Sequence, residues 1–266
     1  MTAPARGVTA LVLVAGRGPD DPLARATGTP HKALVPVDGI PMLLRVVTAL
    51  RATPGVGRIL VAIESERALA ADAALAALVA EGRVAVVPSA QSASASVVRA
   101  LETHPDALPL LVTTADHALL TPGMVRHLLD HAPADADLAV PLVRAATVER
   151  AWPGARRTYL RFRDGARKGC NLYLMRTPAA AGAARFWAGV EADRKRPLRV
   201  ARHLGAVPLA LYALGLLSLE GAVRRLERRL DLAIATLDMP FPDAAIDVDT
   251  PADLAAVAAA LAARRP

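Results

Sequence analysis

The sequence predicts an α/β fold, in which a mainly parallel β-sheet is flanked by helices on both faces. In the first half of the chain, short apolar runs alternate with segments of helical periodicity. Runs that are apolar throughout are typical of strands buried on both faces, as in parallel sheets. The chain has 266 residues and is 53% hydrophobic but only 3% aromatic, so Ala, Val and Leu are expected to fill a large core.

The first half of the chain contains five predicted strands with helices between them. The strands are at Val8–Val14, Arg58–Ile63, Val84–Val87, Leu110–Thr113 and Leu138–Val143. The helices are at Met42–Ala52, Ala68–Ala80, Ala95–Glu102 and Met124–His131. Because ligands of such sheets bind outside the carboxyl ends of the strands, the loops after Val14, Val87 and Thr113 are expected on one rim.

After Ala145 the alternation changes. We expect strands at Tyr159–Phe162 and Asn171–Met175, paired with each other around Asp164-Gly165, and then a helix at Pro178–Asp193. A basic stretch, Arg194-Lys195-Arg196-Pro197, leads to another helix. The sequence thus predicts one domain, residues 1–266, with a core formed by residues 8–143 and 232–266. Residues 144–231 form a mostly helical basic and apolar insertion, assigned to the acceptor or to interactions.

Residues Leu204 to Leu219 carry no charge over sixteen positions. This is shorter than the roughly 20 residues that span a bilayer, and Pro208 and Gly215 interrupt it. A buried helix or helical hairpin is the first interpretation. A homo-oligomer contact and a peripheral membrane contact through residues 194–229 are the alternatives.

The formal charge of +7 is unevenly distributed. Between Arg144 and Arg229 there are 19 Lys and Arg residues against 6 Asp and Glu residues. Such a segment suits phosphorylated ligands or anionic lipid, although solvated arginines on helix faces are the plainer reading. Because zinc, RNP and helix-turn-helix signatures are absent and aromatic residues are few, no nucleic-acid partner is predicted. Only three of the 32 basic residues are lysines, at positions 32, 168 and 195. Two of them lie in segments that are singled out on other grounds, which favours a site there, with chance as the alternative.

The single cysteine, Cys170, excludes an internal disulfide and suits a reducing compartment. The first residues also lack the pattern of a signal peptide, so the expected location is cytoplasmic. Cys170 is interpreted as a packing residue. The six histidines show no metal-ligand spacing and are expected at the surface or as caps.

A glycine loop follows the first predicted strand. Val8–Val14 ends in Ala15-Gly16-Arg17-Gly18, and the polar loop beyond delivers Lys32. Backbone amides of such a loop can bind a polyphosphate, and a lysine can neutralise its charge. The dinucleotide fingerprint fails because Asp21 stands at the third-glycine position, and the Walker motif fails because Ala33 follows the lysine. An ordinary strand-to-loop turn is the alternative.

Two carboxylates are placed to hold a divalent cation. Asp116 follows the strand Leu110–Thr113, and Asp249 stands at a strand-to-helix junction near the end of the chain. Mg²⁺ usually takes one or two carboxylates, with phosphate oxygens and water completing its shell. The alternative is that both carboxylates only stabilise helix N-termini. A capping box with Thr250 is enough to explain the presence of Asp253. Helix capping does not explain Asp247.

Several motifs occur in an order that resembles the MobA-like nucleotidyltransferases. They are Leu13-Val14-Ala15-Gly16-Arg17-Gly18, Pro30-His31-Lys32-Ala33-Leu34, Asp38-Gly39-Ile40-Pro41-Met42-Leu43, Thr114-Ala115-Asp116 and Asp247-Val248-Asp249-Thr250-Pro251. The resemblance covers Val8 to about Leu142 and the last twenty residues. It implies a Rossmann-like fold of the GT-A type, and transfer of a nucleotidyl group from an NTP to a phosphorylated acceptor with release of pyrophosphate.

The resemblance also implies roles for individual residues. It assigns catalysis to Lys32, Asp116 and Asp249. It also assigns Asp116 and Asp249 as ligands of Mg²⁺ (or Mn²⁺), with Asp247 as a supporting metal residue. Nucleotide binding falls to Ala15, Gly16, Arg17, Gly18, Lys32, Ser92, Ser94 and Asp116, although the serines also suit helix caps. Our candidates for the acceptor phosphate are Lys168 and Asn171. The chain departs from the family where Pro19-Asp20-Asp21-Pro22 replaces the usual loop arginine, and where His31 is inserted before Lys32.

Two other functions fit part of this pattern. A GT-A glycosyltransferase shares the strand order and the metal carboxylate, but a nucleotide-sugar needs the glycine loop and Lys32 less than a triphosphate does. A non-catalytic protein that senses nucleotides near a membrane would use the basic segment instead. Only the two enzymes would convert a substrate, so a test for catalytic turnover distinguishes them from the non-catalytic protein.

Overall fold

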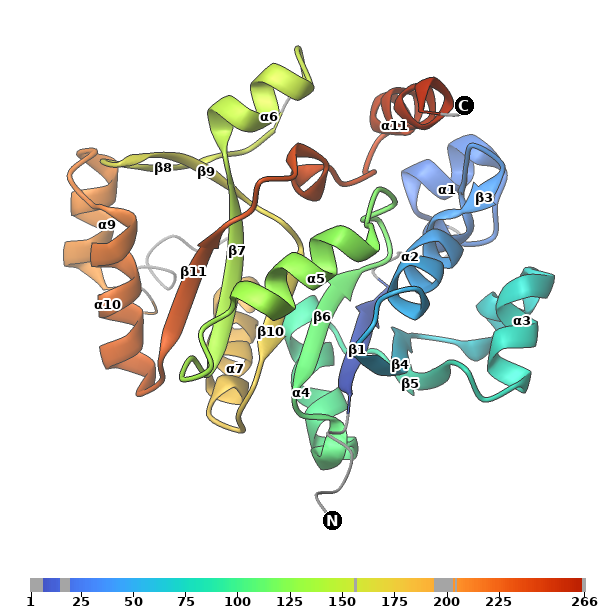
Figure 1. Ribbon diagram of the computed structural model, residues 1–266, viewed down its shortest axis with the longest axis horizontal. Coiled ribbons are helices and arrows are strands. Elements are labelled where there is room, and N and C mark those ends of the chain that lie inside the picture. Colours follow the sequence, from blue (N-terminus) through green and yellow to red (C-terminus); the bar gives the residue numbers. More distant parts are fainter. Residues whose placement is uncertain (1–6, 15–19, 156, 194–202, 204, 265–266) are drawn as a thin grey trace.

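The computed structural model describes residues 7–14, 20–155, 157–193, 203 and 205–264, and has a twisted central sheet with helices on both faces (Figure 1). The sheet runs in the order β5-β4-β1-β6-β10-β7-β9-β8, and β11 also pairs with β7. Its strands are β1 (Val8–Leu13), β4 (Val56–Ile63), β5 (Ala85–Pro88), β6 (Leu110–Thr114), β7 (Leu138–Arg144), β8 (Leu160–Phe162), β9 (Gly165–Gly169), β10 (Leu172–Met175) and β11 (Ile234–Asp238). The short strands β2 (Pro36–Val37) and β3 (Ile40–Pro41) form a separate hairpin.

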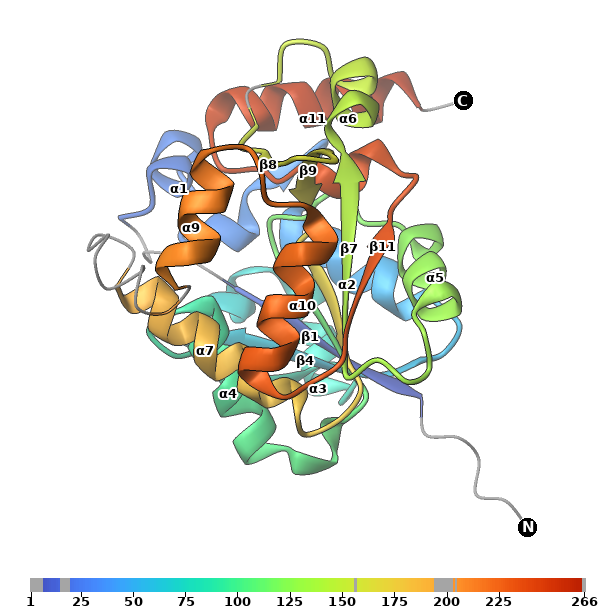
Figure 2. The same ribbon diagram turned by 90° about the vertical axis from the view of Figure 1, so that its left-hand side faces the viewer.

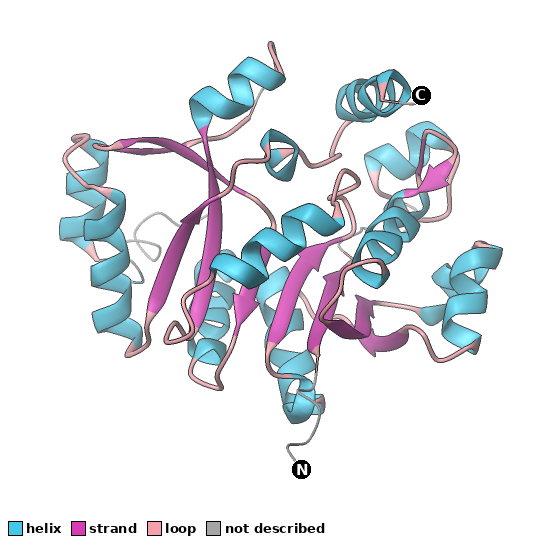
Figure 3. Ribbon diagram, viewed as in Figure 1, coloured by secondary structure: helices cyan, strands magenta, loops and turns pink. Residues whose placement is uncertain are grey.

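The helices lie between these strands and after the last of them, as Figure 3 shows by colour. They are α1 (Pro22–Thr27), α2 (Met42–Arg51), α3 (Ala73–Ala80), α4 (Ala93–Thr103), α5 (Pro122–His131), α6 (Ala145–Ala151), α7 (Ala180–Ala192), α9 (Ala206–Ala213), α10 (Leu219–Leu230) and α11 (Pro251–Ala263). Four 3₁₀ turns complete the described elements: η1 (Lys32–Leu34), η2 (Glu66–Ala71), η3 (Pro105–Ala107) and η4 (Pro242–Ala245).

The mainly parallel α/β fold is confirmed. Strand β1 pairs in parallel with β4 on one side and β6 on the other, and β4 pairs in parallel with β5. Alternate side chains of β1 enter two separate cores: Val12 packs with α2 and α5, whereas Leu11 packs with α4 and α7. Burial on both faces explains why the strand is apolar throughout. The carboxyl ends of β1, β5 and β6 therefore lie on one edge, as expected.

The predicted pairing of Tyr159–Phe162 with Asn171–Met175 is wrong. Strand β8 pairs with β9, which the sequence did not reveal because its segment Gly165–Gly169 holds glycines and charges. Strand β10 instead runs antiparallel between β6 and β7. Its side chains Leu172 and Leu174 are fully buried, so the apolar strand takes an inner position of the sheet.

Other elements also differ from the sequence-based expectations. The helix expected at Ala68–Ala80 is divided into η2 and α3, because the carboxylate of Asp72 accepts a hydrogen bond from the Leu75 N–H (2.9 Å) and caps a new helix. Helix α6 and strand β11 were not predicted. The junction before α11 is irregular rather than a strand: residues 246–249 follow η4 in an extended loop.

Of the two forms expected for Leu204–Leu219, the buried helix is wrong, and the described residues 205–219 instead belong to a helical hairpin at the surface. Helix α9 is only eight residues long, and none of these residues is buried. It ends there because Gly215 adopts a left-handed conformation (φ 69°), after which the chain turns back into α10. The two helices form a hairpin on the outside of the molecule (Figure 2). The predicted basic stretch 194–197 lies outside the described residues. Among the described helices, none has the length and apolar character needed to cross a membrane.

Candidate functional site

The carboxyl end of β6 brings together the beginning and the end of the chain. Leu13 is in register with Thr114, and the Ala115 N–H donates to the Leu13 carbonyl oxygen (3.0 Å). At the next residue, the Asp116 carbonyl oxygen accepts from the N–H of Val248 (3.1 Å). This backbone bond holds the acidic C-terminal motif, with Asp249, beside the end of the strand.

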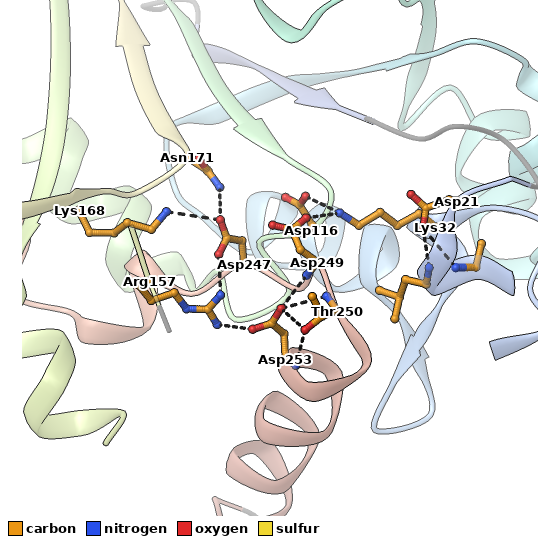
Figure 4. Close-up of polar contacts among 12 residues, drawn as sticks. Asp21, Lys32, Asp116, Arg157, Lys168, Asn171, Asp247, Asp249, Thr250 and Asp253 are labelled. Carbon is orange, nitrogen blue, oxygen red and sulfur yellow. Dashed lines mark hydrogen bonds and ion pairs between the residues drawn. The ribbon is translucent and has the colours of Figure 1, made fainter. Parts of the chain in front are cut away.

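Lys32 lies between these two carboxylates (Figure 4). Its Nζ is 3.0 Å from Oδ2 of Asp116 and 2.6 Å from Oδ1 of Asp249. Burial alone would lower the pKa of this amine, since its side chain is only 10% exposed, but the two carboxylates outweigh that effect and raise the pKa above its ordinary value. The lysine is therefore a permanent cation at neutral pH.

His31, inserted before Lys32 in the sequence, fixes the turn that carries the lysine. Its Nδ1 accepts a hydrogen bond from the Ala33 N–H (3.0 Å), so Nε2 carries the proton and donates to Oε1 of Glu64 (2.9 Å). The imidazole is buried and caps η1. The expectation that this histidine is a cap is confirmed.

A second polar cluster forms around Asp247. Its carboxylate accepts from Lys168 Nζ (3.4 Å), Asn171 Nδ2 (3.4 Å) and Arg157 Nη1 (3.2 Å). Lys168 lies on β9 opposite Val143, the penultimate residue of β7. Asn171 precedes β10 in a left-handed conformation (φ 46°), which asparagine tolerates better than most residues. Strand register thus delivers both predicted acceptor residues to the same edge as Asp116.

Arg157 was not predicted as a site residue. It connects Asp247 with Asp253, whose Oδ1 lies 2.8 Å from Nη2. Asp253 also closes the predicted capping box with Thr250, which is confirmed. Its pKa is lowered, because these hydrogen bonds and the arginine outweigh the effect of burial. An arginine in an irregular loop shows no sequence pattern, and only the fold reveals its partners.

The residues present fit a divalent cation. Oδ1 of Asp116 is buried and accepts no hydrogen bond within the described part of the chain, and Asp249 has a side chain that is 58% exposed. No three His, Cys, Asp or Glu side chains among the described residues gather at one potential metal site. Two carboxylates are enough for Mg²⁺, whose other ligands are usually phosphate oxygens and water.

Charge balance points the same way. Three cations face four carboxylates in the two clusters: Lys32, Arg157 and Lys168 against Asp116, Asp247, Asp249 and Asp253. This excess of negative charge would repel a triphosphate, whereas a bound divalent cation reverses its sign. Among the described residues, the two clusters thus carry one more negative charge than positive ones.

The predicted serines lie at the start of α4. Ser92 is the N-cap, with its Oγ accepting from the Ala95 N–H (3.2 Å). Ser94 donates through Oγ to Oε1 of Glu191 on α7 (3.0 Å), and its N–H donates to Oε2 (3.3 Å). An open groove of about 740 Å³ borders this loop; its lining includes Glu64, Ser89, Ala90, Gln91, Arg99 and Arg185. The predicted glycine-loop residues 15–18 lie outside the described residues.

Two further predictions concern buried groups beside the site. Cys170 is buried, and burial raises the pKa of its thiol to about 12, so the packing role is confirmed. His117 contradicts the expectation of a surface or cap histidine, because its side chain is buried next to Asp116 in the sequence. Its ring nitrogens have no hydrogen-bond partner among the described residues, and burial lowers its pKa to about 4.

Comparison with known proteins gives a consistent result. Residues 10–167 match the family model of the MobA-like NTP transferase domain. A 2-C-methyl-D-erythritol 4-phosphate cytidylyltransferase from Saccharopolyspora erythraea is 36% identical over 143 residues. That match covers 52% of this chain and 61% of the relative, which is less than two thirds of its length.

Solved structures extend the similarity beyond the family match. A hypothetical transferase from Thermus thermophilus is 33% identical with a TM-score of 0.76, covering 93% of this chain and 99% of the other. A CMP:2-keto-3-deoxy-manno-octonic acid synthetase complexed with CTP is 17% identical with a TM-score of 0.55, covering 97% and 99%. At that identity the second likeness shows the fold alone.

Proposed function

Because the chain belongs to the MobA-like NTP transferase family, we propose that it is a nucleotidyltransferase, which moves the NMP group of an NTP to a phosphorylated small molecule and releases pyrophosphate. The acceptor class is a sugar, polyol or cofactor phosphate. The position of Lys32 between Asp116 and Asp249 carries this proposal. It places a buried cation and two carboxylates where the glycine loop after β1 begins.

In the proposed reaction, an oxygen of the acceptor phosphate attacks the α-phosphorus in line, and the bond from this phosphorus to the bridging oxygen breaks. An acceptor that is already a phosphate anion needs no strong base, so positioning and charge stabilisation supply the rate. Lys32 would neutralise charge on the triphosphate. Asp116 and Asp249 would hold Mg²⁺, which when bound stabilises the charge that develops on the phosphate oxygens.

The supporting residues divide into two groups. Gly16 and Gly18, with their neighbours Ala15 and Arg17, would bind the triphosphate. Ser92 and Ser94 would position the nucleoside end, because their loop borders the groove beside α4. This leaves the cluster around Asp247 for the acceptor.

Lys168 and Asn171 would bind the acceptor phosphate, with Asp247 holding them in place rather than binding metal itself. This role is supported by the three side chains that donate hydrogen bonds to the Asp247 carboxylate, those of Arg157, Lys168 and Asn171. Residues 144–231 would then supply the acceptor side of a single catalytic domain. The curated relative is named as a cytidylyltransferase, which makes CTP the first donor to test. The single cysteine supports a cytoplasmic location.

The test is pyrophosphate release with Mg²⁺, using each of the four NTPs against pooled sugar, polyol and cofactor phosphates. The variants Lys32→Ala and Asp116→Asn would run beside Asp130→Asn, which removes an exposed carboxylate on α5. We expect release that requires one NTP and one acceptor, is abolished by EDTA, and is lost in the first two variants only. Release from a nucleotide-sugar, or nucleotide binding without turnover against any acceptor, would contradict the proposal.

A further inference from the structure

The outer face of helix α9 is an exposed apolar stripe. Val207, Ala210 and Leu214 recur at the spacing of one helix face, and Leu216 continues the stripe into the turn before α10. Val207 is 66% exposed, Leu214 70% and Leu216 55%. The α9–α10 hairpin, which carries these residues, faces the viewer in Figure 2. Contiguous exposed apolar side chains of this size mark an interaction surface more often than isolated ones do.

The inner face of the same helix is already in use. The Tyr212 hydroxyl accepts a hydrogen bond from the Arg161 N–H (3.0 Å), and its ring packs edge-on against Phe162 of β8 at 6.0 Å between centroids. At the end of the turn, the Arg163 N–H donates to the Leu217 carbonyl oxygen (2.9 Å). The hairpin is therefore anchored on the protein by one side, and the apolar stripe is the side that remains.

Basic side chains lie on the elements that meet the turn of the hairpin. The exposed charged residues of β8, the turn and the outer face of α10 are Arg161, Arg163, Asp164, Glu220, Arg224 and Arg228. Both acidic members are engaged internally: Asp164 accepts from the Leu219 N–H (2.9 Å), and Glu220 pairs with Arg224 one helical turn away. The surface around the hairpin turn thus combines exposed apolar side chains with a net positive charge.

This combination favours an anionic lipid surface over a second copy of the chain. In a symmetric dimer, the arginines of the two copies would meet others of the same charge around the apolar contact. Headgroup phosphates would instead supply negative charge to all of them, while the Leu and Val side chains enter the boundary of the acyl region. The short helix suits a contact that lies along the membrane plane, because it is too short to span the bilayer.

We propose that the α9–α10 hairpin is a peripheral docking surface for an anionic phospholipid bilayer. The apolar stripe inserts at the headgroup level, and Arg161, Arg163 and Arg228 contact the phosphates. The protein would thereby be held at the surface of a membrane. This inference is independent of the proposed reaction, since it concerns a surface that shares no residue with the Lys32 site.

The experiment is co-sedimentation of the full chain with vesicles of phosphatidylcholine alone, or of phosphatidylcholine mixed with phosphatidylglycerol. Leu214→Glu/Leu216→Glu removes the apolar contact, and Arg161→Gln/Arg228→Gln removes two basic ones. Ile40→Glu is the matched control, because Ile40 is also an exposed apolar residue (41%) but lies in the β2–β3 hairpin, at the opposite end of Figure 1. Circular dichroism and thermal unfolding of each variant would verify that the fold is retained.

We expect the wild type and Ile40→Glu to bind the anionic vesicles at least about tenfold better than the neutral ones. Both double variants should lose most of this binding. Equal binding to both kinds of vesicle, or no binding to either, would overturn the inference. So would a wild type that is dimeric by light scattering and becomes monomeric in Leu214→Glu/Leu216→Glu, because the stripe would then be covered by a second copy.

Discussion

The ammonium of Lys32 lies 3.0 Å from the carboxylate of Asp116, although 84 positions of the chain separate them. The same ammonium reaches Asp249, a further 133 positions along. One lysine thus keeps two like charges together at the carboxyl edge of the sheet. Because those carboxylates also suit a divalent cation, a bound Mg²⁺ would compensate the same negative charge as the lysine.

Replacing Lys32 by Met should therefore make the protein depend on Mg²⁺ for stability. Without the ammonium the two carboxylates repel each other, and we expect a loss of about 1–3 kcal/mol in the free energy of unfolding. Added Mg²⁺ should restore more of it in the variant than in the wild type. Thermal unfolding with and without Mg²⁺ measures this, with Arg126→Met on the surface of α5 as the control. An equal response of variant and wild type to Mg²⁺ would show that the carboxylates do not share a metal.

The two aspartates of the C-terminal motif should behave differently. Asp249→Asn removes a proposed metal ligand, so kcat should fall about 100-fold and the Mg²⁺ concentration for half-maximal rate should rise. Asp247→Asn weakens the hydrogen bonds that the carboxylate accepts from Arg157, Lys168 and Asn171. The KM for the phosphorylated acceptor substrate should therefore rise about tenfold, with an unchanged Mg²⁺ requirement. Steady-state kinetics over a Mg²⁺ series separates the two. A shifted Mg²⁺ requirement in Asp247→Asn would place that carboxylate on the metal.

Glu191→Ala should weaken nucleotide binding rather than catalysis. The carboxylate holds both the N–H and the hydroxyl of Ser94, so its loss frees the loop that borders the groove beside α4. We expect KM for the NTP to rise about five- to tenfold, with kcat and KM for the acceptor unchanged. Glu81→Ala, at the exposed end of α3, is the control. A fall in kcat alone would contradict this positioning role.

His117 should make the protein sensitive to mild acid. Its pKa is about 4 in the folded protein and near 6.5 when unfolded, so between these values the unfolded chain binds more protons. The free energy of unfolding should therefore fall as the pH drops from 6.5 to 4, by about 3 kcal/mol from this residue. Urea unfolding of wild type and His117→Gln at both pH values measures the difference. The exposed His131→Gln should keep the wild-type dependence, and the same dependence in His117→Gln would refute the assignment.

The sequence by itself determined the parts of the protein that follow from local pattern. The apolar run of β1, the capping box of Thr250 and Asp253, and the alternation of strands and helices up to residue 144 report burial and hydrogen bonding within a few neighbouring residues. The choice of Lys32, Asp116 and Asp249 also came from the sequence, because parallel strands end at one edge and the motifs flank that edge.

Only the tertiary structure decided which distant groups meet. It placed β10 between β6 and β7, because full burial of Leu172 and Leu174 outweighs the short connection that favoured a hairpin with β8. That position carries Asn171 to Asp247 and leaves room for Arg157, whose two carboxylate partners lie about ninety positions away along the chain. It also left α9 on the surface. The absence of charge in this segment indicates that it could be buried, but only the whole fold decides whether another element covers it. Pairing across the sheet and burial depend on the whole chain, and no local pattern contains them.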